Sequence, residues 1–359
     1  MAKEERYVAV DPGKYNTKFN SFNYKDGEKL MKFRTKISPG TFDEDMLERG
    51  TFIVQLDEGP TYKVGYGAQG METQTVTSKK AEVHKVCAAA ATALSCGCGD
   101  HQDVNIALGV PYSICCNTEE RHEYIRYMLG EPGEKHTVRI KTNSNGPVYT
   151  SSFTFKKPLV FPEGIGIVYL RVLEGPTGII DLGDVNGNFL YCEGGEPVQS
   201  ASFTNEMGGR VLIARLSQVL TAELGTRVDE RIVAATLLKP YEQRHLVSTN
   251  GNKSIDIKSK EIINRYMLDY ARSIRSACDA RSWSLDFMQF VFGGGTSILL
   301  RHELIEVFGS RIIIPENPEF SNVMGSLRKM CYDKDIDIDA EIKKIRDAKE
   351  AADAKRRSA

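Results

Sequence analysis

Two short turns of the sequence Asp-x-Gly could bind phosphate, because each places a carboxylate next to a glycine. Asp11-Pro12-Gly13 ends an expected strand at Arg6–Asp11, and Asp181-Leu182-Gly183 ends another at Gly178–Leu182. Glycine permits a sharp turn and a close approach of the backbone, so consecutive N–H groups can point at phosphate oxygens. An aspartate at the strand end can hold a hydrated Mg²⁺, which shares carboxylates with phosphate. One such turn is usually a plain turn, but one at the start of each half of the chain favours a paired phosphate site.

The first turn continues along a return strand that carries more candidates. Lys14, Tyr15 and Asn16 lie in the turn, and Lys18 follows where the strand would bring an ammonium beside the phosphates. A lysine in that position, taken alone, is more often a surface residue.

Two glycine runs are candidates for close contact with a nucleotide. Gly293-Gly294-Gly295-Thr296 stands between an expected buried strand and a helix, where a flat ring and a ribose could lie against the backbone. The helix N-terminus adds favourable polarity for an anion. The other interpretation is a tight strand-to-helix turn. Gly208-Gly209 opens a helix at Gly209–Leu224, and either nucleotide approach or helix packing would explain it.

The hydrophobic pattern alternates strands and helices in both halves, which predicts layered α/β domains. Hairpins open each half, and an Ala-rich helix is expected at Ala81–Ser95. Further expectations are a strand at Phe153–Phe161, a helix at Ser297–Phe308 and a last strand at Ile312–Pro315. The tail from residue 339 to 359 is rich in Ala, Lys, Glu and Arg, which is typical of a frayed, solvated helix or of a partner-binding helix.

Composition and charge exclude several classes of protein. The 359 residues include 47 basic and 48 acidic side chains, a formal net charge of −1, so no long-range field attracts DNA or an anionic membrane. Neither a signal peptide nor a membrane-spanning stretch is evident, which favours the cytoplasm. The 8 cysteines show no paired C-x-x-C spacing, so we interpret them as reduced, packed thiols and not as a metal site.

The order of these pieces resembles the superfamily of actin, sugar kinases and chaperone ATPases, and within it the bacterial plasmid-partitioning actins of the ParM type. The family pattern is two phosphate loops, a glycine-rich adenosine motif and two connecting helices. The matching segments are Asp11–Lys18, Pro162–Leu173, Asp181–Asn188, Gly293–Thr296 and Asn317–Leu327.

This resemblance implies an actin-like (ribonuclease H-like) two-domain fold with a nucleotide cleft between the domains. Domain I would span 1–173, with a small subdomain around 30–100, and would be completed by a helix at 322–338. Domain II would span 174–321, and the tail 339–359 would be helical or partly disordered.

The resemblance also implies roles for individual residues. Asp11 and Asp181 would hold Mg²⁺ through water, and Glu163 would orient the attacking water, although beside Pro162 it would otherwise be read as a helix-start carboxylate. Gly13, Lys18 and Gly183 would cradle the phosphates of ATP or GTP, and Gly293–Gly295 would contact the adenosine. One departure is Asp184, where the family usually has a small uncharged residue; it would add negative charge near the phosphates unless it turns outward or joins the metal shell.

Three functions fit this resemblance. The first is a filament-forming ATPase that segregates plasmid DNA through a separate DNA-binding adaptor, with no direct DNA or membrane contact. The second is a small-molecule kinase of the same fold, which turnover dependent on an acceptor would reveal. The third is a cell-shape or division actin, which usually carries an amphipathic membrane segment. The first hypothesis fits the short chain and its neutral charge.

Overall fold

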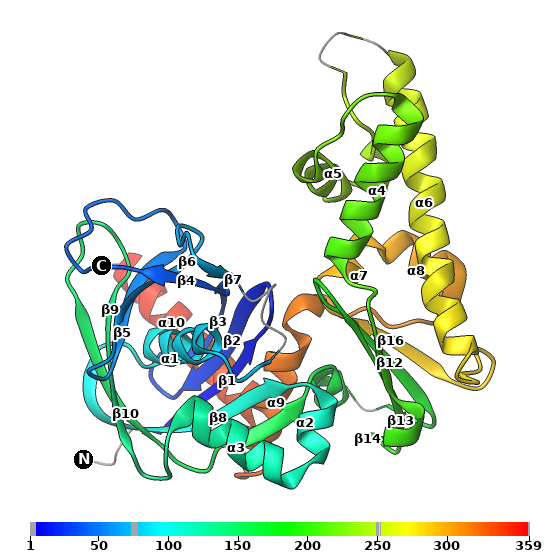
Figure 1. The fold of residues 1–359 in the computed structure, drawn as a ribbon. Coiled ribbons are helices and arrows are strands. Elements are labelled where there is room, and N and C mark those ends of the chain that lie inside the picture. Colours follow the sequence, from blue (N-terminus) through cyan, green and yellow to red (C-terminus); the bar gives the residue numbers. More distant parts are fainter. Residues whose placement is uncertain (1–4, 73–77, 172, 249–250, 252, 358–359) are drawn as a thin grey trace. The chain divides into compact units, whose positions relative to one another are not determined.

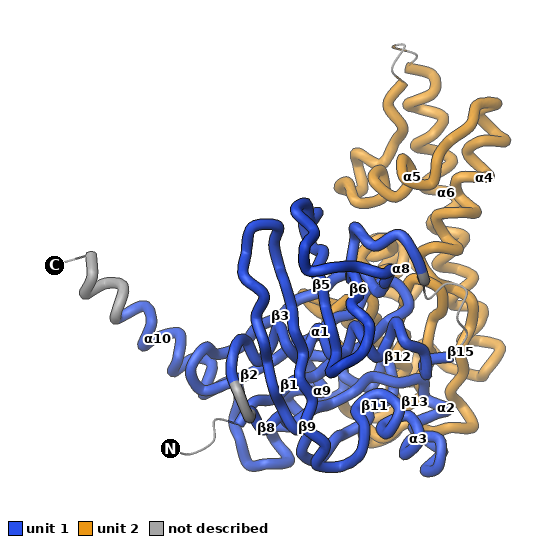
Figure 2. The backbone as a smooth tube through the Cα atoms, turned by 60° about the vertical axis from the view of Figure 1, so that its left-hand side comes forward, with its two compact units in different colours: residues 1–170, 322–359 blue, residues 171–321 orange. Residues whose placement is uncertain are grey.

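The chain divides into two compact units, each with its own sheet and helices. The computed structural model describes residues 5–72, 78–171, 173–248, 251 and 253–357. One unit comprises Met1–Leu170 and Asn322–Ala359, and the other comprises Arg171–Ser321 (Figure 2). The predicted α/β fold is confirmed.

The sheet of the first unit contains, near one edge, the hairpin that carries the first Asp-x-Gly turn. Its strand order is β3-β2-β1-β8-β10-β9-β5-β6-β4-β7, with β11 beside β8. Strand β1 runs parallel to β8 and antiparallel to β2. The strands are β1 Arg6–Pro12, β2 Asn16–Asn23, β3 Gly27–Arg34, β4 Lys36–Pro39, β5 Thr51–Leu56, β6 Thr61–Gly65, β7 Met71–Glu72, β8 Gly99–Val110, β9 Lys135–Lys141, β10 Tyr149–Phe155 and β11 Leu159–Pro162.

Helix α1 (Glu82–Cys96) is buried against this sheet (Figure 1). The run Ala88–Ala91 lies wholly in the core, where small side chains allow the helix axis to approach the strands closely. The other helices of the unit are α2 Tyr112–Cys116, α3 Thr118–Leu129, the 3₁₀ helix η2 Ile165–Leu170, α9 Ser321–Tyr332 and α10 Ile338–Arg357. At Gly325 in α9, an added Cβ would lie 1.8 Å from the Gly166 carbonyl oxygen, so η2 and α9 touch backbone to backbone.

The second unit repeats the hairpin arrangement with a smaller sheet. Strand β12 runs antiparallel to β13 and parallel to β16, as β1 does to β2 and β8. Its strands are β12 Thr177–Leu182, β13 Gly187–Glu193, β14 Glu196–Pro197, β15 Phe203–Asn205 and β16 Gln289–Gly293. Its helices are α4 Gly209–Leu224, α5 Glu230–Leu237, α6 Lys253–Asp279, α7 Thr296–Leu299 and α8 Arg301–Phe308, with 3₁₀ turns at Gln199–Ala201, Tyr241–Gln243 and Pro318–Phe320. Helices α4 and α6 pack side by side (Figure 1).

Three expected elements are wrong in detail. The strand expected at Phe153–Phe161 is two strands, because β10 ends at Phe155 and β11 begins at Leu159 after Pro158, which has no N–H to donate. The helix expected at Ser297–Phe308 is broken at Leu300, a fully buried residue with non-helical backbone angles. The strand expected at Ile312–Pro315 is a single bridge between Ile313 and Val291.

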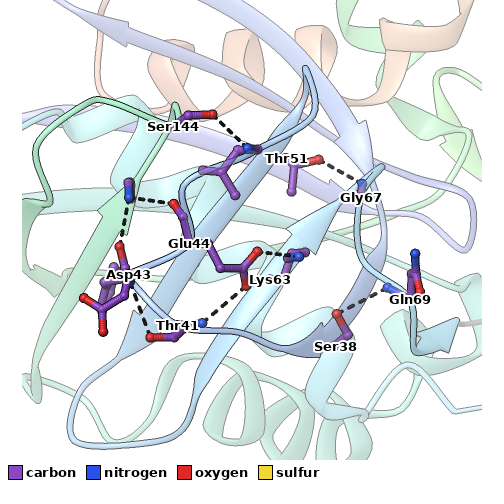
Figure 3. A network of polar contacts seen from close by, with 12 residues as sticks. Ser38, Thr41, Asp43, Glu44, Thr51, Lys63, Gly67, Gln69 and Ser144 are labelled. Carbon is purple, nitrogen blue, oxygen red and sulfur yellow. Dashed lines mark hydrogen bonds and ion pairs between the residues drawn. The ribbon is translucent and has the colours of Figure 1, made fainter.

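Polar contacts hold the long connection between β4 and β5 in place (Figure 3). The Lys141 ammonium donates to the carbonyl oxygens of Phe42 and Glu44, each at 2.9 Å. Glu44 forms an ion pair with Lys63, and the Leu47 N–H donates to Ser144 Oγ at 2.8 Å. This connection is therefore fixed to β6 and to the region of β9.

Helix α10, which contains most of the charged tail, contacts the rest of the first unit. Ile338 is buried, and Arg328 on α9 pairs with Asp339 at 2.7 Å. Further along α10, the Lys349 ammonium donates to the Asp26 carbonyl oxygen at 2.8 Å. Among the described residues, no helix combines the length and the apolar character needed to cross a membrane.

Candidate nucleotide site

The first glycine turn places Asp11 opposite Lys18. These residues face each other across β1 and β2, and Lys18 Nζ lies 3.8 Å from Asp11 Oδ2. The Gly13 N–H donates to the Asp11 carbonyl oxygen at 2.9 Å. A Cβ at Gly13 would lie 2.7 Å from the Asn16 carbonyl oxygen, so a side chain would force the turn open. Glycine is therefore a requirement of the turn itself.

Asp11 is a buried carboxylate with spare hydrogen-bonding capacity. Its exposure is 5%, and burial raises its pKa, against the opposing effect of Lys18. Within the described residues, Asp11 Oδ1 and Asn16 Oδ1 are buried without a hydrogen-bond partner. A buried carboxylate oxygen with no donor is costly unless something else satisfies it. The waters of a hydrated cation could donate hydrogen bonds to this oxygen, so Asp11 is a suitable group to hold Mg²⁺ through water.

The rest of the first turn is ordered by the neighbouring strand β3. The Tyr15 ring lies 3.3 Å from the Arg34 guanidinium carbon, and the Thr35 N–H donates to the Tyr15 carbonyl oxygen at 3.0 Å. Lys14 is half-buried and Tyr15 is 39% exposed. These turn residues thus lie beside Asp11 and Gly13, and their contact with a nucleotide stays a prediction.

Lys79, which was not predicted from the sequence as a site residue, links Glu163 to the first turn. The Glu163 N–H donates to the Val110 carbonyl oxygen at 2.8 Å, which fixes its backbone at the end of β8. Lys79 Nζ lies 2.7 Å from Glu163 Oε1 and donates to the Pro12 carbonyl oxygen at 2.9 Å. The structure therefore brings Glu163 and the first glycine turn together.

Two more buried polar side chains lie in this region and were also missed. His84 on α1 is 1% exposed, and burial, reinforced by the charge of Lys79, lowers its pKa to about 3. Tyr124 on α3 is fully buried, its hydroxyl has no hydrogen-bond partner within the described residues, and its pKa is raised by burial and then by Glu163 and Asp11. The neutral His84 leaves the lysines as the cations around Asp11.

The second glycine turn repeats the geometry of the first. Asp181 is 8% exposed, faces Asn188 on β13 and is paired with Gly293 on the parallel strand β16. The Gly183 N–H donates to the Asn186 carbonyl oxygen at 2.9 Å, and a Cβ at Gly183 would lie 3.0 Å from that oxygen. The unusual Asn186-Gly187-Asn188 sequence therefore closes the same kind of hairpin.

Asp184 forms an ion pair that the sequence did not reveal. Arg210 at the start of α4 donates to Asp184 Oδ2 at 2.9 Å, and its backbone N–H donates to the Asp184 carbonyl oxygen at 2.7 Å. The two side chains are 29% and 22% exposed. Arg210 thus offsets the extra negative charge of this turn and ties the turn to the helix.

The glycines at the start of α4 meet a packing requirement. A Cβ at Gly208 would lie 2.3 Å from the Asp184 carbonyl oxygen, and one at Gly209 would lie 2.6 Å from Thr296 Oγ1. Thr296 Oγ1 itself donates to the Gly183 carbonyl oxygen at 2.7 Å. Packing against the second turn at Gly208 and against Thr296 at Gly209 therefore accounts for both glycines, and nucleotide contact at these positions stays a prediction.

Within the three-glycine run, Gly294 and Gly295 differ in whether the structure has room for a side chain. Gly294 has φ +79°, and its Cβ would lie 2.2 Å from the Leu182 carbonyl oxygen and 2.8 Å from Asp181 Oδ1. Gly295 has ordinary helical angles, and the nearest atom to its Cβ, on Glu319, is 4.0 Å away. Glycine is structurally obligatory at Gly294, whereas Gly295 leaves space that a ligand could use.

The candidate residues thus gather into one set in each unit. The first set contains Asp11, Gly13, Lys14, Tyr15, Asn16, Lys18 and Glu163, and the second contains Asp181, Gly183, Asp184, Gly208, Gly209, Gly293, Gly294, Gly295 and Thr296. In the described part of the chain, no group of three His, Cys, Asp or Glu side chains is arranged to hold a bare metal ion.

The fold, with a glycine hairpin in each unit, is actin-like. Residues 9–166 match the family described as "Actin like proteins N terminal domain". A comparison with curated protein sequences found no match.

Solved structures with the same two-domain fold cover almost the whole chain. The Alp12 filament structure is 24% identical, with a TM-score of 0.68 over 92% of this chain and 99% of that one. Ta0583, an archaeal actin homolog, is 19% identical, with a TM-score of 0.72 over 91% and 99%. The ParM filament from Clostridium botulinum is 19% identical, with a TM-score of 0.67 over 92% and 99%. The chain has the actin-like fold that these proteins share.

Proposed function

We propose that this protein is a nucleotide-dependent, filament-forming actin-like ATPase of the bacterial cytoplasm. The main support is the pair of hairpins. In each one, the first strand carries a buried aspartate near its end, and the turn that follows packs a glycine closely against an asparagine carbonyl oxygen. The similarity to an Alp12 filament and to a ParM filament supports self-assembly. The complex of Ta0583 with ADP supports nucleotide binding.

In this proposal both sets of residues bind one ATP or GTP with Mg²⁺. Asp11 and Asp181 hold the metal through water, and Gly13, Lys18 and Gly183 bind the phosphates, with Lys14, Tyr15 and Asn16 beside them. The second turn and the glycine runs bind the rest of the nucleotide through Asp184, Gly208, Gly209, Gly293–Gly295 and Thr296. When bound, Mg²⁺ neutralises charge on the phosphates.

Glu163 is proposed to accept a proton or a hydrogen bond from the attacking water. Phosphoryl transfer to water depends on positioning and charge neutralisation more than on covalent chemistry. A carboxylate fixed beside the phosphate turn can orient and polarise a water molecule. The contact of Lys79 with both Glu163 and Pro12 supports this placement.

We further propose that the filament moves plasmid DNA through a DNA-binding adaptor protein. A formal net charge of −1 provides little attraction to the DNA backbone, so direct DNA binding is not expected. Nucleotide hydrolysis would weaken subunit contacts and so shift the population from filament to monomer.

Nucleotide-dependent sedimentation tests the proposed assembly. We expect the protein to pellet and to scatter light with ATP or GTP and Mg²⁺, and to remain in the supernatant without nucleotide. Chelation of Mg²⁺ should reduce the pellet. Absence of polymer with either nucleotide at any practical protein concentration would refute filament formation.

Replacing Arg210 with methionine is expected to weaken nucleotide binding about 10-fold, because Asp184 would then face the phosphates without its ion-pair partner. The measurement is titration with a fluorescent nucleotide. The double variant Arg210→Met/Asp184→Asn should regain wild-type affinity, since both charges are removed. Equally weak binding by the double variant would show that Arg210 acts in some other way.

A further inference from the structure

Lys79 is a buried cation in a position that disfavours lysine for two reasons. Its side chain is 6% exposed, and it lies two residues before Ala81, the N-cap of α1. Burial removes the hydration of the ammonium group, and the N-terminus of a helix repels positive charge. A lysine is expected in such a place only where specific partners offset both costs.

Two partners of Lys79 belong to the proposed phosphate site. Its ammonium donates to the Pro12 carbonyl oxygen at 2.9 Å and lies 2.7 Å from Glu163 Oε1. Pro12 directly precedes Gly13 in the turn, and Glu163 follows β11 at the end of β8. One charged group therefore connects the backbone of the phosphate turn to the carboxylate proposed to orient water.

The other basic side chains near Glu163 and the first turn are uncharged or have other partners. His84, on α1, has a pKa of about 3 because of burial, so it is uncharged at neutral pH. Lys18 faces Asp11 across the hairpin. The adjacent Lys80 pairs instead with Glu123, and these side chains are 39% and 54% exposed. Lys79 is thus distinguished from its neighbour by both burial and partners.

Resting on the proposed function, we propose that Lys79 is a positioning residue that fixes the Glu163 carboxylate and the first glycine turn as one unit. Lys79 itself does not contact the attacking water. Phosphates that bind the turn then find the carboxylate at a set place, and a displacement of the turn would carry Glu163 with it. Precise placement of this kind affects the rate of the chemical step more than it affects binding.

The test compares Lys79→Met, Glu163→Gln and the double variant, with Lys80→Met as the matched control. We expect Lys79→Met to lower kcat about 10- to 100-fold and to change KM less than about 3-fold. In the Glu163→Gln background the same substitution should change kcat less than about 3-fold, because the group that Lys79 positions is already altered. Lys80→Met should match the wild type. Effects on kcat that multiply in the double variant would overturn the proposal.

A crystal structure of Lys79→Met gives a readout that does not depend on turnover. The proposal expects the Glu163 carboxylate to leave its position beside Pro12 in this variant and to keep it in Lys80→Met. An unchanged Glu163 side chain would overturn it.

If the single variant fails to fold, the double variant, which lacks both charges, should fold and bind nucleotide. If both variants fail to fold while Lys80→Met folds normally, Lys79 has a purely structural role and the proposal is overturned. Absence of any hydrolysis by the wild type would instead count against the proposed ATPase, and the crystal structures would still decide the role of Lys79.

Discussion

Replacing Asp11 with asparagine is expected to lower nucleotide hydrolysis about 100-fold or more, because the hydrated metal loses a charged partner in a buried site. Phosphate release measured at saturating Mg²⁺ and nucleotide checks this result. The amide of asparagine keeps the size of the side chain, so the loss would report charge and not shape. Asp11 faces Lys18 and is almost fully buried, which makes its charge effective.

The same substitution is expected to leave the nucleotide-free protein at least as stable as the wild type. Burial raises the pKa of Asp11, which means that the folded protein disfavours its charged form. Removing that charge relieves the cost, as is common at functional sites. Thermal unfolding with and without nucleotide separates the two effects, and Asp45→Asn, an exposed acid of the same unit, is the control. Unchanged hydrolysis in Asp11→Asn would remove Asp11 from the metal site.

The second large effect is expected at Gly294. Substitution by alanine should destabilise the fold by about 3 kcal/mol or more, through an unfavourable positive φ and a steric clash. The Cβ would lie 2.2 Å from the Leu182 carbonyl oxygen, which is backbone and cannot move aside. Denaturant unfolding, or loss of soluble protein on expression, measures this effect.

The adjacent Gly295 provides the matched control and also tests the ligand hypothesis. Its backbone angles suit alanine, and an added Cβ meets nothing nearer than 4.0 Å. Gly295→Ala should therefore fold with wild-type stability. If the run binds adenosine, the variant should bind nucleotide more weakly, because the methyl group occupies the space of the ligand. Equal destabilisation by both substitutions would contradict the distinction between the two glycines.

The sequence predicted the parts of the site that depend on local chemistry. In both halves an apolar strand is followed by Asp-x-Gly, and glycine favours a tight hairpin there because a Cβ would lie close to the carbonyl oxygen opposite. Both hairpins are present, and so is the helix that begins at Gly209. The break between β10 and β11 could have been predicted from Pro158, whereas the break at Leu300 carries no local signal.

Local sequence patterns were enough to predict the α/β class, the two glycine hairpins and the positions of their aspartates, because these features follow from the hydrophobic period and from turn chemistry within a few residues. The pairing of Lys79 with Glu163 and of Arg210 with Asp184 became evident only in the folded structure. These partners are 84 and 26 residues apart in the chain, since 163 − 79 = 84 and 210 − 184 = 26. Such charges come together only when the chain folds, because pairing between distant strands and packing of helices determine the position of each side chain.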